Sequence, residues 1–301
     1  MYDIIIIGGG PAGLTAATYA CRAGKSVLVI EKAAFGGQIT WSPRVENFPG
    51  TISVSGAELG DMLLAQAMEQ GADVELEEVV SLENGAEGKK VLCESGAEFE
   101  AKAVIIATGA KPRMLGLENE EALVGNGVGF CAVCDGAFYK NRVVAVNGGG
   151  NSALQDALLL SESCKKVYLI HRREGFRGEA KLVEALRGKN NVEFVLNATV
   201  SRLIGEDELK AVAVMQNGEE RIIELDGLFV AIGHQPQNEA FANWITLDAR
   251  GYSDAGEDCL TATPGVFVAG DCRTKKVRQV TTAAADGAVA ALAACSYLDS
   301  L

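Results

Sequence analysis

Two cysteines three positions apart, Cys131 and Cys134, have the types and spacing needed for redox or metal chemistry. Such a pair can close a small disulfide ring or supply half of a metal site. Zinc usually needs four ligands, and the sequence has no second pair at this spacing and only two histidines, which weakens the metal interpretation. The pair lies between two glycine-rich loops, which indicates a protein that moves electrons from a nucleotide to sulfur.

The first glycine-rich loop has the pattern of a dinucleotide-binding turn. A predicted strand (residues 2–7) precedes the loop, and a predicted helix (14–23) and strand (26–30) follow it, ending at Glu31. Free N–H groups at the start of the helix suit a pyrophosphate, and a carboxylate at position 31 suits both hydroxyls of an unsubstituted ribose. The loop is therefore predicted to bind the adenosine half of FAD. The loop residues assigned to this site are Gly8, Gly10, Pro11, Ala12 and Gly13.

The same pattern recurs 140 positions later, with a predicted strand (142–146), helix (154–161) and strand (166–170). The position equivalent to Glu31 is now His171, and a basic cluster follows it. Guanidinium groups bind a 2′-phosphate in bidentate fashion, so this loop is predicted to hold NADPH; a solvated basic edge is the alternative. The residues assigned to this site are Gly148, Gly150, Asn151, Ser152, Ala153, His171, Arg172, Arg173 and Arg177.

Composition narrows the class of partner. The chain has 301 residues and a net charge of −13, which argues against a nucleic-acid partner and against docking on anionic membranes. The N-terminus carries no secretory signal, so we expect a cytoplasmic protein in which a disulfide is catalytic. Residues 283–294 are small and apolar but include Asp286, and we expect a packed helix there, not a membrane span.

The repeat predicts an α/β protein with two domains. Further buried strands are expected at residues 103–108, 228–232 and 266–269. The last of these strands is expected to complete the first repeat, so residues 1–113 and 242–301 are expected to form a discontinuous FAD-binding domain. Residues 114–241 would form the NADPH-binding domain that carries the cysteine pair. Residues 74–100 and 192–224 alternate apolar and polar residues, as antiparallel β-meanders do.

Over essentially its whole length the chain resembles the low-molecular-weight thioredoxin reductases. The motifs that carry the resemblance are the two glycine loops, Gly36-Gly37-Gln38, residues 46–50, Ala107-Thr108-Gly109, Cys131 to Asp135, His171-Arg172-Arg173, and Gly270-Asp271 followed by Arg278-Gln279. The resemblance implies two Rossmann-like three-layer (ββα) domains, bound FAD and NADPH, and a homodimer. It further implies that Asp271 contacts the ribityl chain. The other residues it assigns to the FAD site are Gly36, Gly37, Gln38, Asn47, Thr108, Gly109, Gly270, Arg278, Gln279 and Val280.

The resemblance also implies a route for the electrons. NADPH reduces FAD, the flavin reduces the Cys131–Cys134 disulfide, and dithiol–disulfide exchange passes the electrons to thioredoxin or a similar protein. Cys134 would face the flavin and Cys131 would attack the partner. Asp135 would be the general acid, with a helix N-cap as the alternative use of this residue. One departure from the family pattern is Asn151, which replaces an aspartate that is common in the second loop.

Four other interpretations compete with this one. The flavin component of an alkyl hydroperoxide reductase system carries an additional N-terminal module, whereas this sequence starts at the first strand. The related ferredoxin–NADP reductases lack the cysteine pair. Ferredoxin-fed thioredoxin reductases have degraded nucleotide motifs, whereas Arg172, Arg173 and Arg177 are intact here. A non-catalytic flavin sensor has no need for both a redox pair and a basic nucleotide site.

Overall fold

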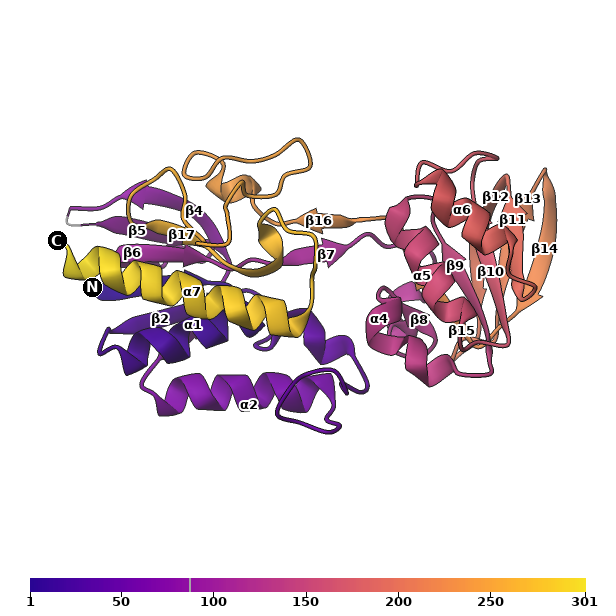
Figure 1. The fold of residues 1–301 in the computed structure, drawn as a ribbon. Coiled ribbons are helices and arrows are strands. Elements are labelled where there is room, and N and C mark those ends of the chain that lie inside the picture. The colour runs from indigo at the N-terminus through magenta and orange to yellow at the C-terminus, as the bar shows by residue number, and fades with distance from the viewer. Residues whose placement is uncertain (87) are drawn as a thin grey trace. The chain divides into compact units, whose positions relative to one another are not determined.

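The computed structural model describes residues 1–86 and 88–301. The chain divides into two compact units (Figure 1). The first unit comprises residues 1–111 and 235–301, and the second comprises residues 112–234. The chain thus crosses between units at 111/112 and 234/235, where the sequence analysis placed the crossings at 113/114 and 241/242. Two short strands, β7 (Ala110–Pro112) and β16 (His234–Pro236), pair at these crossings.

The first unit is built on a seven-stranded sheet in the order β3-β2-β1-β6-β5-β4, with β17 also paired to β6. Strands β3, β2, β1, β6 and β17 are parallel, whereas β4, β5 and β6 form an antiparallel meander. The elements of this unit are β1 (Tyr2–Ile7), α1 (Pro11–Arg22), β2 (Val27–Glu31), η1 (Gly37–Trp41), α2 (Gly56–Glu69), β3 (Asp73–Leu76), β4 (Val79–Asn84), β5 (Lys89–Cys93), β6 (Glu98–Ile106), η3 (Glu239–Phe241), β17 (Val266–Val268), η4 (Gly270–Cys272) and α7 (Val280–Asp299).

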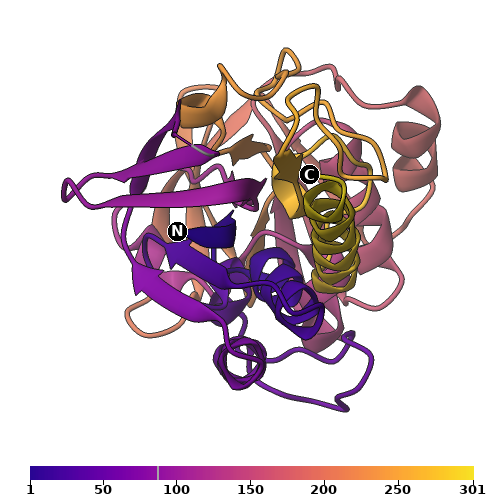
Figure 2. The ribbon, with the colours of Figure 1, turned by 90° about the vertical axis from the view of Figure 1, so that its left-hand side faces the viewer.

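Alternation along the parallel strands gives this unit three layers. Successive side chains of a strand point to opposite faces, so Ile4 and Ile6 pack with the helices α1 and α7. Figure 2, seen from the end of α7, shows these two helices beside each other on one face of the sheet. Ile5 and Ile7 pack on the other face, with Leu82 and other residues of the meander. Both faces are covered, which explains why these strands are apolar at every position.

The second unit repeats this plan. A parallel sheet in the order β11-β10-β9-β15-β8 has helix α5 on one face and the antiparallel sheet β12-β13-β14 on the other. The predicted α/β class with two three-layer domains is therefore confirmed. The elements are α3 (Glu120–Leu123), β8 (Val128–Gly129), α4 (Ala132–Asp135), η2 (Gly136–Tyr139), β9 (Val143–Asn147), α5 (Asn151–Ser161), β10 (Lys166–His171), α6 (Ala180–Arg187), β11 (Val192–Leu196), β12 (Ala198–Ile204), β13 (Ala211–Gln216), β14 (Glu219–Glu224) and β15 (Gly227–Val230).

The structure corrects the extent of both expected meanders. The first strand of each range, β3 and β11, belongs to the parallel sheet and not to the meander. Both strands lie at the edge of their sheet, where one neighbour is missing and part of the strand faces solvent. An edge strand of this kind alternates polar and apolar residues much as a meander strand does.

Helix α7 is the one helix among residues 1–86 and 88–301 that is long and apolar enough to cross a membrane. Its buried residues Ala290, Ala291 and Ala294 lie in the same core cluster as the alanines of α1. Asp286 in its middle is 5% exposed and pairs with Arg273. These contacts are those of a core helix in a globular domain, as the sequence predicts.

Candidate active site

Cys131 and Cys134 form a disulfide at the start of the short helix α4, with their Cα atoms 5.3 Å apart. The two sulfurs are therefore joined to each other and are not two separate metal ligands. Both cysteines are partly exposed, and Val133 between them is 62% exposed, so the pair lies at the surface of the second unit. No cluster of three or more His, Cys, Asp and Glu in the described part of the chain could hold a metal ion.

The backbone at this helix favours one sulfur as the nucleophile. Cys131 is the N-cap residue of α4, and the backbone N–H of Cys134 donates to its Sγ over 3.1 Å. A hydrogen bond of this kind stabilises negative charge on sulfur, so it would support Cys131 as a nucleophile once the disulfide is reduced.

The six other cysteines lie in surroundings that disfavour the thiolate. Burial raises the pKa of each of their thiols above its ordinary value, to about 12 for Cys259 and about 11 for Cys272. A thiol with a raised pKa is a poor nucleophile at neutral pH. The residues concerned are Cys21, Cys93, Cys164, Cys259, Cys272 and Cys295.

Asp135 is the last residue of α4, directly after Cys134. It also stands at the N-cap position of η2, but its side chain makes no capping hydrogen bond there. Its Oδ2 lies 3.5 Å from the point where a Cβ on Gly129 would sit, so the carboxylate is beside β8. The negative charge of Asp135 adds to burial in raising the pKa of the nearby Tyr139 phenol to about 12.

The first glycine loop leaves an open space where a phosphate could lie. A Cβ on Gly8 would come 2.3 Å from the Ala107 carbonyl oxygen, and one on Gly13 would come 1.9 Å from the Gly8 oxygen, so both positions require glycine. A Cβ on Gly10 would meet nothing closer than 4.0 Å. Helix α1 starts at Pro11, three residues before the predicted start, so its free N–H groups point at this open space.

Glu31 ends strand β2 beside the loop. One carboxylate oxygen accepts from the Gly9 N–H over 2.7 Å, and the other accepts from the Ala33 N–H over 2.9 Å. The carboxylate is therefore held next to the glycine turn, where a ribose attached to a pyrophosphate on Gly10 would be.

Three other predicted segments converge on the same loop. A Cβ on Gly37 would lie 3.1 Å from the Cα of Gly10, so the two backbones are in close contact. Gln38 donates from its Nε2 to the Ala110 oxygen over 2.8 Å, next to Gly109. A Cβ on Gly270 would lie 2.8 Å from the Cβ of Ala12, which brings η4 against the first turn of α1.

Asp271 follows Gly270 and is the least satisfied carboxylate of this group. Its Oδ1 is buried and accepts no hydrogen bond from the described residues, and the nearest cation, Lys275 Nζ, is 4.0 Å away. Burial raises the pKa of this carboxyl to about 6. A buried acceptor without a donor is a site that a ligand hydroxyl would complete.

The remaining predicted residues of the first unit are joined through Arg278 and Gln279. The Arg278 guanidinium lies 4.2 Å from the ring centroid of Tyr252 and donates from Nε to the Asp271 carbonyl oxygen. Gln279 is the N-cap residue of α7, directly before Val280, and its Oε1 accepts from Asn47 Nδ2 over 3.4 Å. Thr108 bonds separately to Asn238 over 3.1 Å.

In the second glycine loop, as in the first, the middle glycine of the motif has open space beside it. A Cβ on Gly148 would come 2.4 Å from the Ala231 oxygen, whereas one on Gly150 would meet nothing within 4 Å. Ala153 stands where the first loop has Gly13 and is fully buried, and Ser152 beside it is exposed. Helix α5 begins at Asn151, again three residues before the predicted start, so this loop also presents free N–H groups.

His171 ends strand β10 and is buried against this loop, with 6% exposure. It stacks on Phe176 with 5.1 Å between ring centroids, and its Nε2 has no hydrogen-bond partner among the described residues. Burial, together with the nearby arginines, lowers the pKa of His171, so the ring is neutral at pH 7. The side chains of Arg172, Arg173 and Arg177 are exposed and available to an anion.

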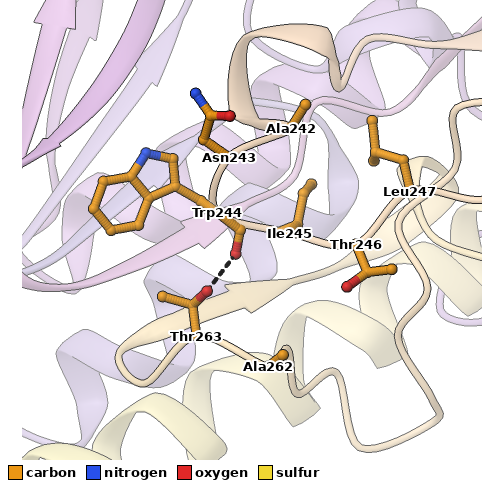
Figure 3. A pocket seen from close by; sticks show the side chains of 8 residues that line it. All are labelled: Ala242, Asn243, Trp244, Ile245, Thr246, Leu247, Ala262 and Thr263. Atoms are coloured by element: carbon orange, nitrogen blue, oxygen red, sulfur yellow. Dashed lines mark hydrogen bonds between the residues drawn. The ribbon is translucent and has the colours of Figure 1, made fainter.

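A pocket of about 300 Å³ in the first unit lies apart from these residues (Figure 3). None of the predicted site residues lines it. Thr263 closes one side by donating to the Trp244 carbonyl oxygen, and Trp244 donates from Nε1 to Leu82. The lining residues are Ala242, Asn243, Trp244, Ile245, Thr246, Leu247, Ala262 and Thr263.

Sequence reasoning missed the buried ion cluster that supports Asp271. Asp286 accepts from the N–H of Gly270, from Arg273 and from Lys275, over 2.8 to 3.0 Å. Burial alone would raise the pKa of Asp286, but its hydrogen bonds to these two cations hold the value below the ordinary one. The one signal available was an aspartate in the middle of an otherwise apolar helix.

Comparison with known proteins matches this arrangement over the whole chain. A family profile for pyridine nucleotide-disulphide oxidoreductases matches residues 2–287. A thioredoxin reductase of Listeria monocytogenes is 41% identical over 305 residues, covering 100% of this chain and 95% of the relative, and that of Bacillus subtilis is 38% identical, covering 100% and 96%. The crystal structure of thioredoxin reductase from Streptococcus pyogenes superimposes with a TM-score of 0.94 at 38% identity, covering 100% of this chain and 99% of that one. The chain therefore belongs to the pyridine nucleotide-disulphide oxidoreductase family of enzymes, and the three relatives named above are thioredoxin reductases.

Proposed function

We propose that this chain is a thioredoxin reductase that carries electrons from NADPH, through FAD and the Cys131–Cys134 disulfide, to the disulfide of thioredoxin. The observation that carries the proposal is the disulfide itself, in a chain with two glycine loops of opposite charge. The relatives named above support the same activity.

The first unit is the proposed FAD site. The open space above Gly10, the anchored Glu31 carboxylate and the unpaired Oδ1 of Asp271 fit a pyrophosphate, a ribose and a ribityl chain respectively. The second unit is the proposed NADPH site, with the space above Gly150 for the pyrophosphate and the arginine cluster for the 2′-phosphate. A bound flavin would supply two-electron transfer between the nicotinamide and the disulfide.

The chain's own residues then carry out thiol–disulfide exchange. The Cys131 thiolate attacks one sulfur of the partner's disulfide, forms a mixed disulfide and releases the other partner sulfur as a thiolate. Cys134 next attacks Cys131 Sγ, which restores the ring and releases the partner's second sulfur. Asp135, adjacent to Cys134, accepts the proton that Cys134 loses and passes it to the departing thiolate. The partner leaves with both sulfurs reduced. We also propose that the enzyme is a cytoplasmic homodimer.

An anaerobic titration tests the proposal. NADPH should bleach the yellow protein more effectively than NADH, and oxidised thioredoxin should restore the colour. Cys134→Ser should still bleach with NADPH but should not turn over thioredoxin, because the ring can no longer form. Bleaching by neither nucleotide, or near-wild-type turnover by Cys134→Ser, would contradict the proposed route.

A further inference from the structure

Asn151, the first residue of α5, makes a two-point contact with Glu179, the residue before α6. Its Oδ1 accepts from the backbone N–H of Glu179 over 2.8 Å. Its Nδ2 donates to the Glu179 Oε1 over 3.0 Å. The pair therefore joins the second glycine loop to the far end of the basic loop, residues 172–178.

The backbone beside this contact is pinned as well. The N–H groups of Arg177 and Gly178 both donate to the carbonyl oxygen of Gly149, over 2.9 and 3.2 Å. A Cβ on Gly178 would come 2.4 Å from Leu154 Cδ1 and 3.0 Å from Asn151 Oδ1, so the chain passes too close to α5 for a side chain. The end of the basic loop is thus held in one position before any ligand arrives.

The position of the loop backbone matters because the arginines that it carries are exposed and have long side chains. A long side chain that is ordered on binding reduces the affinity, and a mobile backbone beneath it would add to that cost. A loop fixed in advance confines the cost to the arginine side chains. The contact also needs the amide: an aspartate at position 151 has no donor for the Glu179 carboxylate, and two carboxylates would face each other.

We propose that Asn151 and Glu179 form a side-chain latch that holds the basic loop against the second glycine loop, and that both are positioning residues for recognition of a ribose 2′-phosphate. The role in recognition rests on the proposed binding of NADPH by the second unit. The sequence places Asn151, but not Glu179, in the predicted nucleotide site, and the role proposed for both residues acts through their contact with each other.

Three variants separate the effect of the latch contact from the effect of net charge alone. Asn151→Asp breaks the second contact and adds one negative charge. Asn151→Asp/Glu179→Gln restores the net charge and the contact with the donor reversed, because glutamine donates to the new aspartate. Asn151→Asp/Glu184→Gln is the matched control, since Glu184 is exposed on the same helix α6 and removing it restores the net charge without restoring the contact.

Two measurements on the full chain test the proposal. Calorimetry gives the affinities for adenosine 2′,5′-bisphosphate and for 5′-AMP, and amide hydrogen exchange gives the protection of Arg177, Gly178 and Glu179. We expect Asn151→Asp and its Glu184→Gln double to bind the bisphosphate about tenfold more weakly and to lose about tenfold in protection. The Glu179→Gln double should recover both properties. The charge added at position 151 acts on the 5′-phosphate of both ligands, so the recognition role is measured by the ratio of the two affinities, which should fall in Asn151→Asp and recover in the Glu179→Gln double.

Failure of the latch and failure of the NADPH assignment would give different results in these two measurements. Wild-type protection in Asn151→Asp, or equal rescue by Glu179→Gln and Glu184→Gln, would overturn the latch. If the wild type binds both nucleotides equally, the NADPH assignment and the recognition role fail together, and the exchange measurement alone then decides whether the latch exists.

Discussion

Carboxylates around the first glycine loop differ in their hydrogen-bond donors. Glu31 accepts from two backbone N–H groups, and Asp286 accepts from two buried cations that hold the pKa of its carboxyl below the ordinary value. Asp271 has no such donor at its Oδ1 among residues 1–86 and 88–301, and burial raises the pKa of its carboxyl from 3.8 to about 6. A protein that keeps an unsatisfied carboxylate gives up stability for a ligand contact.

Replacing Asp271 by Asn should therefore stabilise the flavin-free protein at high pH. The folded pKa is raised, so the contribution of Asp271 to stability is full below pH 3.8 and is lost as pH rises through about 6. Two pKa units correspond to about 3 kcal/mol, and because the side chain is 31% exposed we expect a gain in the free energy of unfolding of about 1 to 2 kcal/mol at pH 8.

Both tryptophans, Trp41 and Trp244, lie in the first unit, so urea unfolding followed by tryptophan fluorescence reports this unit alone. The gain should shrink as pH falls from 8 towards 4, because protonated aspartic acid resembles asparagine. A gain that stays constant over this range would show that ionisation of Asp271 is not its cause.

Candidate catalytic and binding residues were predictable from the sequence where they lie close together along the chain or directly follow a clear strand. Cys131 and Cys134 lie three positions apart, and Glu31 and His171 follow strands whose apolar runs are clear. The contact between Arg273 and Asp286 was not, because it joins the turn after η4 to the middle of α7, and only the packing of α7 on α1 brings them together.

At the scale of elements, the position of a strand was easier to predict than whether it pairs in parallel or antiparallel. The buried strands β1, β9 and β10 were located within a residue or so, because strands covered on both faces are continuously apolar. The edge strands β3 and β11 were assigned to meanders, since half-exposed strands look alike whether they pair in parallel or antiparallel. Pairing depends on what lies on either side of a strand, which a local pattern does not contain.

Helix α7 depends on its buried aspartate for its attachment to η4. Asp286→Asn would leave the buried Arg273 and Lys275 with their longer contacts to Glu257, at 3.3 Å, and to Asp271, at 4.0 Å. We expect the free energy of unfolding to fall by about 3 to 5 kcal/mol. Tryptophan fluorescence during urea unfolding at pH 7 measures the loss. Asp299→Asn is the matched control on the same helix, since its pair with Lys25 is at the surface and should contribute far less. Equal losses in the two variants would contradict a special role for the buried cluster.

At the scale of the whole molecule, the two units have separate hydrophobic cores. Every residue of two core clusters lies within 112–234, and every residue of the other two lies within 1–111 or 235–301. The second unit is also one continuous stretch of chain, inserted into the first through β7 and β16. Electrons must nevertheless pass between a proposed flavin site in one unit and the disulfide in the other.

Separate cores predict that residues 112–234 fold when expressed alone. A stretch of this size with its own core and both faces of its sheet covered meets the requirements of an independent domain. We expect a cooperative thermal transition by circular dichroism, a Cys131–Cys134 disulfide, and affinity for adenosine 2′,5′-bisphosphate within about threefold of the full chain, or about 0.6 kcal/mol. The fragment should not reduce thioredoxin with NADPH, because it lacks the first glycine loop and every residue of the proposed FAD site in the first unit. A fragment that is unfolded, or that folds but does not bind the bisphosphate while the full chain does, would show that the first unit completes the second.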